Sequence, residues 1–313
     1  MRDDKLQRLE AVARMYYELD LTQAEIAKRL QVSRPFVSRL LAEAKALGIV
    51  EVRITPQGPV GVQTLQAAVA DFGIRGGTLV PDGDDGETNL ALGQAALSLI
   101  EELGGGCLGL GWGHVIGVMV ADLEQHPASR SKVTNVTPLI GNRGVPIRSY
   151  HSNENTRIVA QQLHARAHYL HAPSMAESPH ELELLTQTSH FQSVTAEWSR
   201  LDIALVNIGN YPSTPDFASG ARFGTLLARR QAAGHLIAYY YDKQGEIIHS
   251  DHDYVIQIPF ELLRKTPNVI GICSANVSPT ALLGALRTGI FTHVVARANV
   301  MEEARYLQET AAA

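Results

Sequence analysis

The spacing of apolar residues changes once along the chain, near residue 61. Before it, apolar positions recur every three or four residues, as in amphipathic helices; after it, short β-type apolar runs alternate with helical stretches. Residues 55–61, TPQGPVG, hold two prolines and two glycines at this change. We therefore predict a first domain over 1–54, a linker over 55–61 and a larger domain over 62–313.

In the first domain, the pattern predicts three helices. A helix over 5–19 places Leu6, Leu9, Val12, Ala13 and Tyr16 on one face. We expect this face to pack on the two helices that follow, with part of it available to pair two subunits.

The next two helices, over 22–30 and 33–47, are joined by a tight connection at 31–33. Thr22 and Glu25 have the spacing of a capping box, Ser33 suits an N-cap, and Pro35 falls in a first turn, where its missing N–H is not needed. Two short helices that share a small apolar core across a short turn predict a helix-turn-helix.

The second helix of this pair has an apolar face and a polar face. Phe36, Val37, Leu40, Leu41 and Ala44 recur at helical spacing and are expected to face inward. The polar and helix-start residues that remain are predicted to form a surface for double-stranded operator DNA: Thr22, Gln23, Ser33, Arg34, Pro35, Ser38, Arg39 and Lys45.

Within this surface, roles differ by position. Arg34 and Ser38 lie early in the helix, where they would reach base edges, whereas Arg39 and Lys45 would neutralise phosphates. An ordinary solvated helix face is the alternative. The alternating IVEVRI of residues 49–54 predicts a short strand, as in a winged helix-turn-helix.

The larger domain alternates predicted strands and helices, which is typical of an α/β fold with a mostly parallel sheet covered on both faces. The predicted strands are 78–80, 107–112, 136–140, 169–171, 203–208, 236–241, 254–258, 269–273 and 293–296. The predicted helices are 62–72, 88–103, 114–124, 154–165, 221–232, 279–287 and 300–308.

Sheets of this kind bind ligands at the carboxyl ends of their strands. The loops there carry glycines, which allow close backbone approach, and Asn, Ser and His, which can bond a hydroxylated ligand. Turn chemistry is the alternative for each loop. The predicted effector-binding residues are Gly111, Trp112, Gly113, His114, Gly141, Asn142, Arg143, Gly209, Asn210, His235, Ser274, Asn276 and Ser278.

Other chemistry finds little support in the sequence. The run HSDHD at 249–253 resembles a metal cluster, but a solvated loop is the preferred interpretation, because a metal site also needs fixed geometry. The motif G-x-S-x-G is absent, and no acid–base pair of carboxylates stands out. We expect no catalytic residue, no metal and no cofactor.

The composition indicates the compartment of the protein and where its charge lies. The two cysteines, Cys107 and Cys273, lie far apart in apolar stretches, which fits a reducing cytoplasm. No signal peptide or membrane span is predicted. Residues 1–54 carry 10 Lys/Arg and 8 Asp/Glu, a net charge of +2, and the rest carry 17 and 24, a net charge of −7. DNA affinity must therefore come from a local patch, which dimerisation would double.

Nearly the whole chain resembles the SorC family of bacterial sugar-responsive transcriptional regulators. The segments that carry the resemblance, in family order, are YYELDLTQAEIAKRLQVSRPFVSRLLAEAKALGIVEVRI, LGLGWGHVI, LDIALVNIGN, AAGHLIAYYYDKQGEII and VIGICSANVSPTALLGALRTGIFTHVVA. The resemblance implies an effector domain similar to sugar-phosphate isomerases or deaminases, a phosphorylated sugar as the usual effector, and assembly as a homodimer or homotetramer.

Three positions depart from the family pattern. Val115 stands where the family commonly has a phosphate-binding Thr, His235 where it has a carboxylate, and Ser278 where it often has Lys. Losing a cation and a hydroxyl removes charge-assisted bonds to phosphate. The hypothesis is that the effector is not a typical phosphorylated sugar, or that His114, Arg143 and His235 hold phosphate by another route. A degenerate pocket that only supports oligomerisation is the alternative.

Together these features predict a cytoplasmic transcriptional regulator of a carbohydrate-utilisation operon. Its partners would be operator DNA and a small sugar or polyol effector, with or without a phosphate, and no membrane. Two rivals stay open: an isomerase- or deaminase-like enzyme with a DNA-binding appendage, and an architectural DNA-binding protein without an effector.

Overall fold

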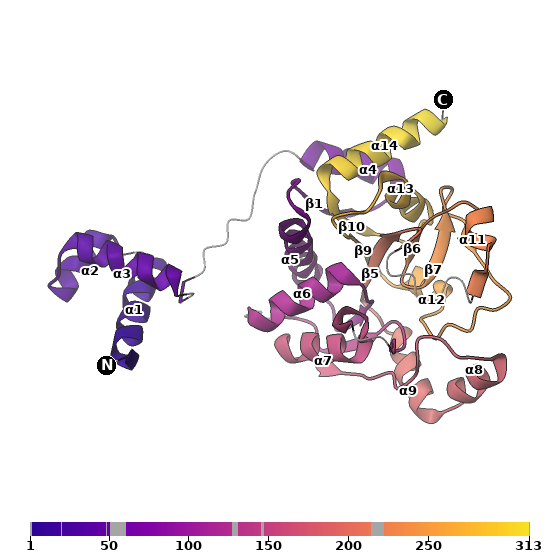
Figure 1. Ribbon diagram of the computed structural model, residues 1–313, viewed down its shortest axis with the longest axis horizontal. Coiled ribbons are helices and arrows are strands. Elements are labelled where there is room, and N and C mark those ends of the chain that lie inside the picture. The colour runs from indigo at the N-terminus through magenta and orange to yellow at the C-terminus, as the bar shows by residue number, and fades with distance from the viewer. Residues whose placement is uncertain are drawn as a thin grey trace. The chain divides into compact units, whose positions relative to one another are not determined.

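The computed structural model describes residues 2–19, 21–47, 49–50, 61–126, 131–144, 147–213 and 222–312 (Figure 1). The chain forms two compact units, Met1–Gln57 and Gly58–Ala313, and each is considered by itself. Within the described residues, no helix combines the length and the apolar character needed to cross a membrane.

The described part of the first unit contains three helices: α1 (Arg2–Tyr17), α2 (Gln23–Leu30) and α3 (Arg34–Ala46). Their shared core includes the fully buried Leu9, Val12, Ile26 and Val37. Burying each such side chain stabilises the folded unit by about 1.5–3 kcal/mol. The packing therefore holds together three short helices that would not be stable alone. Leu6, expected on the packing face of α1, is 42% exposed.

The predicted caps are confirmed atom by atom. The Thr22 hydroxyl accepts from the Glu25 backbone N–H at 3.3 Å, and the Glu25 carboxylate accepts from the Thr22 backbone N–H at 2.8 Å. The Ser33 hydroxyl accepts from the Phe36 N–H at 3.3 Å. These bonds set where α2 and α3 begin, and so set the turn between them. Of the strand predicted over 49–54, only Ile49 and Val50 lie within the described residues, and no strand is assigned there.

The second unit is built on a sheet of ten described strands. They are β1 (Gly76–Val80), β2 (Cys107–Leu110), β3 (Asn135–Pro138), β4 (Arg166–Ala167), β5 (Ile203–Asn210), β6 (Ala232–Leu236), β7 (Tyr239–Asp242), β8 (Ile247–Ile248), β9 (Asn268–Cys273) and β10 (His293–Arg297). The main path runs β1-β10-β9-β5-β2-β3-β4, and all its pairings are parallel. The antiparallel strands β6, β7 and β8 extend from the end of β5.

Helices cover both faces of the sheet (Figure 1). Among the described residues of this unit, the helices are α4 (Val62–Phe72), α5 (Asp85–Leu103), α6 (His114–Gln125), α7 (Ser152–Gln162), α8 (Pro179–Thr186), α9 (Ser189–Trp198), α11 (Leu226–Arg229), α12 (Phe260–Lys265), α13 (Pro279–Arg287) and α14 (Ala298–Ala312), with a 3₁₀ turn at Arg148–Tyr150. One apolar cluster joins α5, α6 and α7 to the sheet, and another joins α4, α13 and α14 to its opposite face.

This arrangement places a crevice beside β5. Its neighbour β2 leads into α6 on one face, while its other neighbour β9 leads into α13 on the opposite face. Where connections leave a parallel sheet toward opposite faces, the strand ends separate and leave room for a ligand.

Several predicted elements are wrong, and each error has a local cause. The strand expected over 236–241 is a hairpin of β6 and β7, because Ile237 adopts a left-handed φ of 51° and reverses the chain. The helix expected over 221–232 begins at a residue outside the described ones, and in the described part it is interrupted: residues 222–223 are helical and α11 follows, because Gly224 and Gln231 take left-handed φ values of 53° and 52°.

Two further strands are misplaced. The strand expected over 169–171 lies earlier, as β4, because the Asn153 side chain bonds both the N–H and the carbonyl of Leu170 and so occupies its backbone groups. Residues 254–258 form isolated bridges from Val255 and Gln257 rather than a strand. The helices α8, α9 and α12 were not predicted.

Candidate functional sites

The helix-turn-helix presents an exposed basic face on α3. Arg34, Ser38 and Lys45 are exposed and follow one another at helical spacing, while Val37, Leu40, Leu41 and Ala44 are buried behind them. Phe36, expected inside, is only half-buried, and the guanidinium carbons of Arg8 and Arg39 lie 5.2 and 5.6 Å from its ring centre. Arg8 on α1 therefore adds a cation beside α3 that the sequence reasoning missed.

The remaining predicted DNA-binding residues differ in their exposure and in the contacts that they make within the first unit. Thr22 and Ser33 are exposed, but their hydroxyls are engaged in the caps described above. Pro35 is exposed and Gln23 is half-buried. The ammonium of Lys45 lies 5.9 Å from the Tyr17 ring centre, which holds that side chain near the end of α1.

In the larger unit, a cavity of about 300 Å³ lies at the carboxyl ends of β2, β5 and β9. Six of the predicted effector-binding residues line it: Gly113, His114, Gly209, His235, Ser274 and Asn276. The lining also includes residues that were not predicted, namely Asp85, Asn89, Val115, Tyr150, Asn207 and Ile208. The structure therefore brings together loops that are far apart in the chain.

The backbone around the cavity is shaped by close approaches. Gly113 adopts a φ of +120° just before α6, a conformation that strongly favours glycine, and it gives α6 no side-chain cap. A Cβ atom on Gly209 would lie 2.4 Å from the Nε2 atom of His235, so only glycine lets that imidazole lie against β5. The β9–α13 loop is held from α5, because the Asn89 carboxamide accepts from the Ala275 N–H at 2.9 Å.

Asn207 is the clearest polar residue that sequence reasoning missed. It is 6% exposed, and its Oδ1 atom has no hydrogen-bond partner among the described residues. A buried acceptor left without a partner is costly, and it marks a place where a ligand or water donor would bind. The signal in the sequence was a lone Asn within the apolar run IALVNI of β5.

A second, smaller cavity has a volume of about 50 Å³, and it shares the lining residues Tyr150 and His235 with the first. Trp112 and Arg143, both predicted, also line this smaller chamber, together with Arg222 and Tyr240, which were not. The Arg143 guanidinium carbon lies 5.3 Å from the Trp112 ring centre and 5.9 Å from that of Tyr150. Burial raises the pKa of the Tyr150 hydroxyl, an effect that the Arg143 charge opposes.

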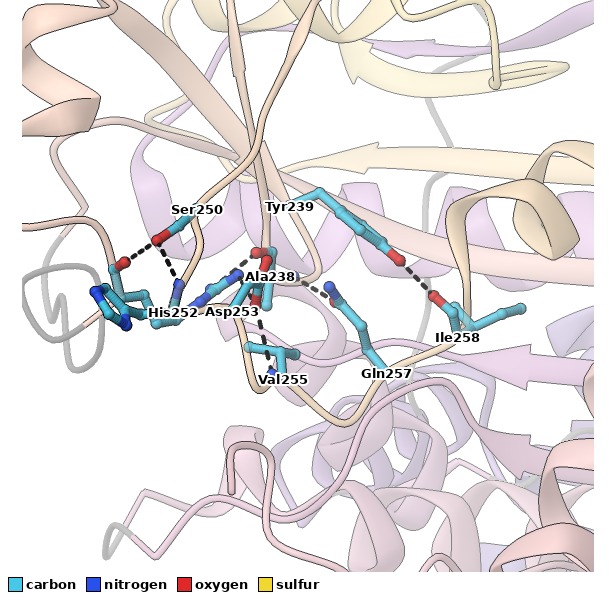
Figure 2. A network of polar contacts seen from close by, with 9 residues as sticks. Ala238, Tyr239, Ser250, His252, Asp253, Val255, Gln257 and Ile258 are labelled. Atoms are coloured by element: carbon cyan, nitrogen blue, oxygen red, sulfur yellow. Dashed lines mark hydrogen bonds and ion pairs between the residues drawn. The ribbon is translucent and has the colours of Figure 1, made fainter. Parts of the chain in front are cut away.

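Arg222 belongs to a partly buried polar network, and Figure 2 shows its members Ala238, Ser250 and Asp253. The side chain is 3% exposed; Nη2 bonds the Asp253 carboxylate at 2.8 Å, and Nη1 donates to the Ala238 carbonyl at 3.0 Å. The Ser250 hydroxyl donates to the Arg222 carbonyl. Three of the five residues in the HSDHD run are exposed, as expected of a solvated loop, and the half-buried Asp253 is in addition an ion-pair partner.

The other predicted effector-binding residues line neither cavity and make internal contacts. Gly111 and Gly141 allow close approach of the Leu205 and Pro173 carbonyls. The Asn142 carboxamide accepts from the Asn153 N–H at 3.1 Å. Two more residues stabilise the β9–α13 connection: Asn210 bonds the Asn276 carbonyl and the Ser278 N–H, each at 2.8 Å, and the Ser278 hydroxyl caps α13.

Comparison with known proteins supplies independent findings. Residues 61–302 match the family model described as "Putative sugar-binding domain", and residues 6–58 match that of the MarR family. The sorbitol operon regulator of Klebsiella pneumoniae is 30% identical, across 90% of this chain and 92% of that protein. The deoxyribonucleoside regulator of Bacillus subtilis is 24% identical, across 94% and 96%.

The similarity extends to three dimensions. The crystal structure of the full-length Klebsiella pneumoniae regulator, SorC, matches with a TM-score of 0.81 and 27% sequence identity, across 95% of this chain and 97% of that one. A probable sor operon regulator from Shigella flexneri matches with a TM-score of 0.69 and 25% identity, across 77% of this chain and 98% of that one.

Proposed function

Because the chain belongs to the SorC family and is a sugar-responsive transcriptional regulator, we propose that an effector in the strand-end cavity controls operator binding by α3. The observation that carries this proposal is the pairing, in one chain, of an exposed basic helix-turn-helix face with a polar cavity in a separate unit. The regulated genes would form a carbohydrate-utilisation operon, and the protein would act in the bacterial cytoplasm.

On the DNA side, α3 would enter the major groove. Arg34 and Ser38 lie near its start, where side chains of a recognition helix reach base edges, and both are exposed. Arg39 and Lys45 would contact phosphates, as would Arg8. A two-fold operator is expected, because the proposed homodimer or homotetramer would present its α3 helices in symmetric pairs.

On the effector side, the chemistry suits a small hydroxylated compound. The cavity offers carboxamides from Asn89, Asn207 and Asn276, the Ser274 hydroxyl and the Asp85 carboxylate. Such groups bond sugar or polyol hydroxyls as donors or acceptors. Effector binding would favour one arrangement of the subunits and so change the spacing of the two α3 helices. The change in operator affinity cannot exceed the effector's differential affinity for the two arrangements.

DNA binding is tested by fluorescence anisotropy with the promoter fragment upstream of the protein's own gene and a scrambled fragment. We expect Arg34→Ala to weaken binding to the promoter fragment more than to the scrambled one. Arg39→Ala should weaken both and reduce the slope of log affinity against log salt by about one. Arg14→Ala, an exposed arginine paired with Glu10 on α1, is the control and should change little.

The results discriminate between the assignments. Equal losses of affinity for both DNA fragments in Arg34→Ala would make Arg34 a phosphate contact, and an unchanged salt slope for Arg39→Ala would exclude a phosphate contact by Arg39.

Effector binding is tested by the melting temperature in the presence of sugars, polyols and their phosphates. A protein that binds the promoter fragment but responds to none of them would contradict the sensor function.

A further inference from the structure

The exposed side of α3 has two flanks that carry different residues. At 3.6 residues per turn, Arg34 and Ser38 lie about 40° apart around the helix axis. Arg39 lies about 100° beyond Ser38 on the same sense of rotation, and Phe36 about 160° beyond it. Helix α1 lies along this second flank, because the guanidinium carbon of its Arg8 is 5.2 Å from the Phe36 ring centre.

Phe36 lies beside the guanidinium groups of two arginines from different helices. Its ring is half-buried and packs against the core of the first unit, which fixes its position. The guanidinium carbon of Arg8 is 5.2 Å from the ring centre and that of Arg39 is 5.6 Å from it, both within the range of cation–π contacts. One aromatic ring therefore holds two positive charges near each other, and we call these two residues the Phe36 arginine pair.

Neither member of the Phe36 arginine pair has an anionic partner in the described part of the chain. Both side chains are exposed, and neither forms an ion pair or a hydrogen bond with another described residue. Glu43, the carboxylate one helical turn after Arg39, is instead paired with Lys5 of α1. Two like charges held near each other repel, so the pair favours an incoming anion.

The DNA backbone supplies such an anion on this side of α3. With α3 in the major groove and Arg34 toward the bases, the flank next to α1 faces one wall of the groove, where phosphates lie. Consecutive phosphates of one strand are spaced by about 3.4 Å along the helix axis, so the pair can contact one phosphate or two neighbouring ones. Guanidinium N–H groups match phosphate oxygens, and arginines that a ring already orders lose less entropy on binding.

We propose that Arg8 and Arg39 bind DNA phosphates together, and that Phe36 is the positioning residue that orders both. Helix α1 then contributes to DNA binding directly, in addition to supporting α3. This inference rests on the proposed operator binding by α3 and adds to it a contact that does not depend on base sequence.

The test separates ordering of the arginines by Phe36 from its packing. Affinity of the full-length protein for the promoter and scrambled fragments is measured by fluorescence anisotropy over a range of salt concentrations. Phe36→Leu keeps an apolar side chain and every charge, and it should weaken binding to both fragments by about threefold or more. Phe36→Tyr keeps the ring and should retain the affinity. Arg8→Ala should weaken both and reduce the salt slope by about one, whereas the control Arg14→Ala should change neither.

A cycle of substitutions identifies the positioning role. In protein that carries both Arg8→Ala and Arg39→Ala, Phe36→Leu should cause little further loss of affinity, because no cation remains for the ring to order. Melting curves followed by circular dichroism establish that each variant is folded.

Three results would overturn the inference. One is an unchanged affinity in Phe36→Leu, and another is an unchanged salt slope in Arg8→Ala. The third is a loss from Phe36→Leu that is equally large with and without the two arginines, which would make Phe36 a packing residue only. Each leaves the proposed function standing if the unaltered protein still prefers the promoter fragment to the scrambled one. Failure of the unaltered protein to bind either fragment would contradict both.

Discussion

The ion pair between Arg222 and Asp253 gives the most direct test of the packing around the small chamber. Its Nη2–Oδ1 distance is 2.8 Å, and the exposed fractions of the two side chains are 3% and 26%. Asp253→Ala would leave a guanidinium buried without its counter-charge. Removing one partner of a buried pair costs about 3–5 kcal/mol. The partial exposure of Asp253 places this variant near the lower end, at about 3 kcal/mol.

Urea unfolding followed by tryptophan fluorescence measures this cost, because Trp112 and Trp198 both lie in the larger unit. A cost of about 3 kcal/mol corresponds to a fall in melting temperature of about 6–12 °C for a unit of this size. Arg222→Met should cost less, because the Asp253 left behind retains contact with solvent. Adding Asp253→Ala to Arg222→Met should then cost little more, which reveals the coupling.

A matched exposed pair serves as the control. Glu154 and Arg157 are also 2.8 Å apart, but their side chains are 42% and 43% exposed, and Glu154→Ala should cost at most about 1 kcal/mol. Added salt should shrink the Glu154→Ala cost and leave that of Asp253→Ala nearly unchanged. If Asp253→Ala costs no more than Glu154→Ala, Arg222 does not depend on this partner and the reasoning is refuted.

Three further predictions concern other parts of the chain. Gly209→Ala should displace the His235 imidazole and abolish the effector-induced rise in melting temperature. The control Gly144→Ala, which has open space around its Cβ position, should keep that rise. An unchanged rise in melting temperature in Gly209→Ala would contradict the role of this contact. Burial raises the pKa of the Cys107 thiol to about 12 and also raises the pKa of the Cys273 thiol. A thiol reagent at neutral pH should therefore label both cysteines only when urea unfolds the protein. Rapid labelling of the native protein would disprove their burial. Hydrogen bonds from Thr22 lower the pKa of Glu25 in the folded state, so their contribution to stability is present above the unfolded pKa of 4.5 and is lost as the pH falls through the folded pKa. Unfolding followed by circular dichroism should therefore show that Thr22→Ala destabilises the first unit by about 1 kcal/mol at neutral pH and by less in acid. An equal cost at both pH values would exclude the capping box.

The sequence alone determined the features that depend on neighbouring residues. The caps at Thr22 and Ser33, the helix-turn-helix and the parallel α/β pattern are all set by residues within one or two helical turns of each other or by the period of apolar positions. The predicted strands were wrong where a single residue overrides the periodic pattern of apolar positions. The left-handed Ile237 and the Asn153 bonds to Leu170 are examples, and neither has a periodic signature.

Only the tertiary structure decided which strand-end residues share a cavity. Gly113, Gly209 and Ser274 meet there because β2, β5 and β9 are neighbours in the sheet, although they are far apart in the chain. Asn210 and Ser278, equally polar and equally close to strand ends, instead bond to the β9–α13 connection or cap its helix. The set of side chains that lines each cavity likewise has no sequence signature, because strand order and side-chain direction, rather than distance along the chain, determine which groups face each other.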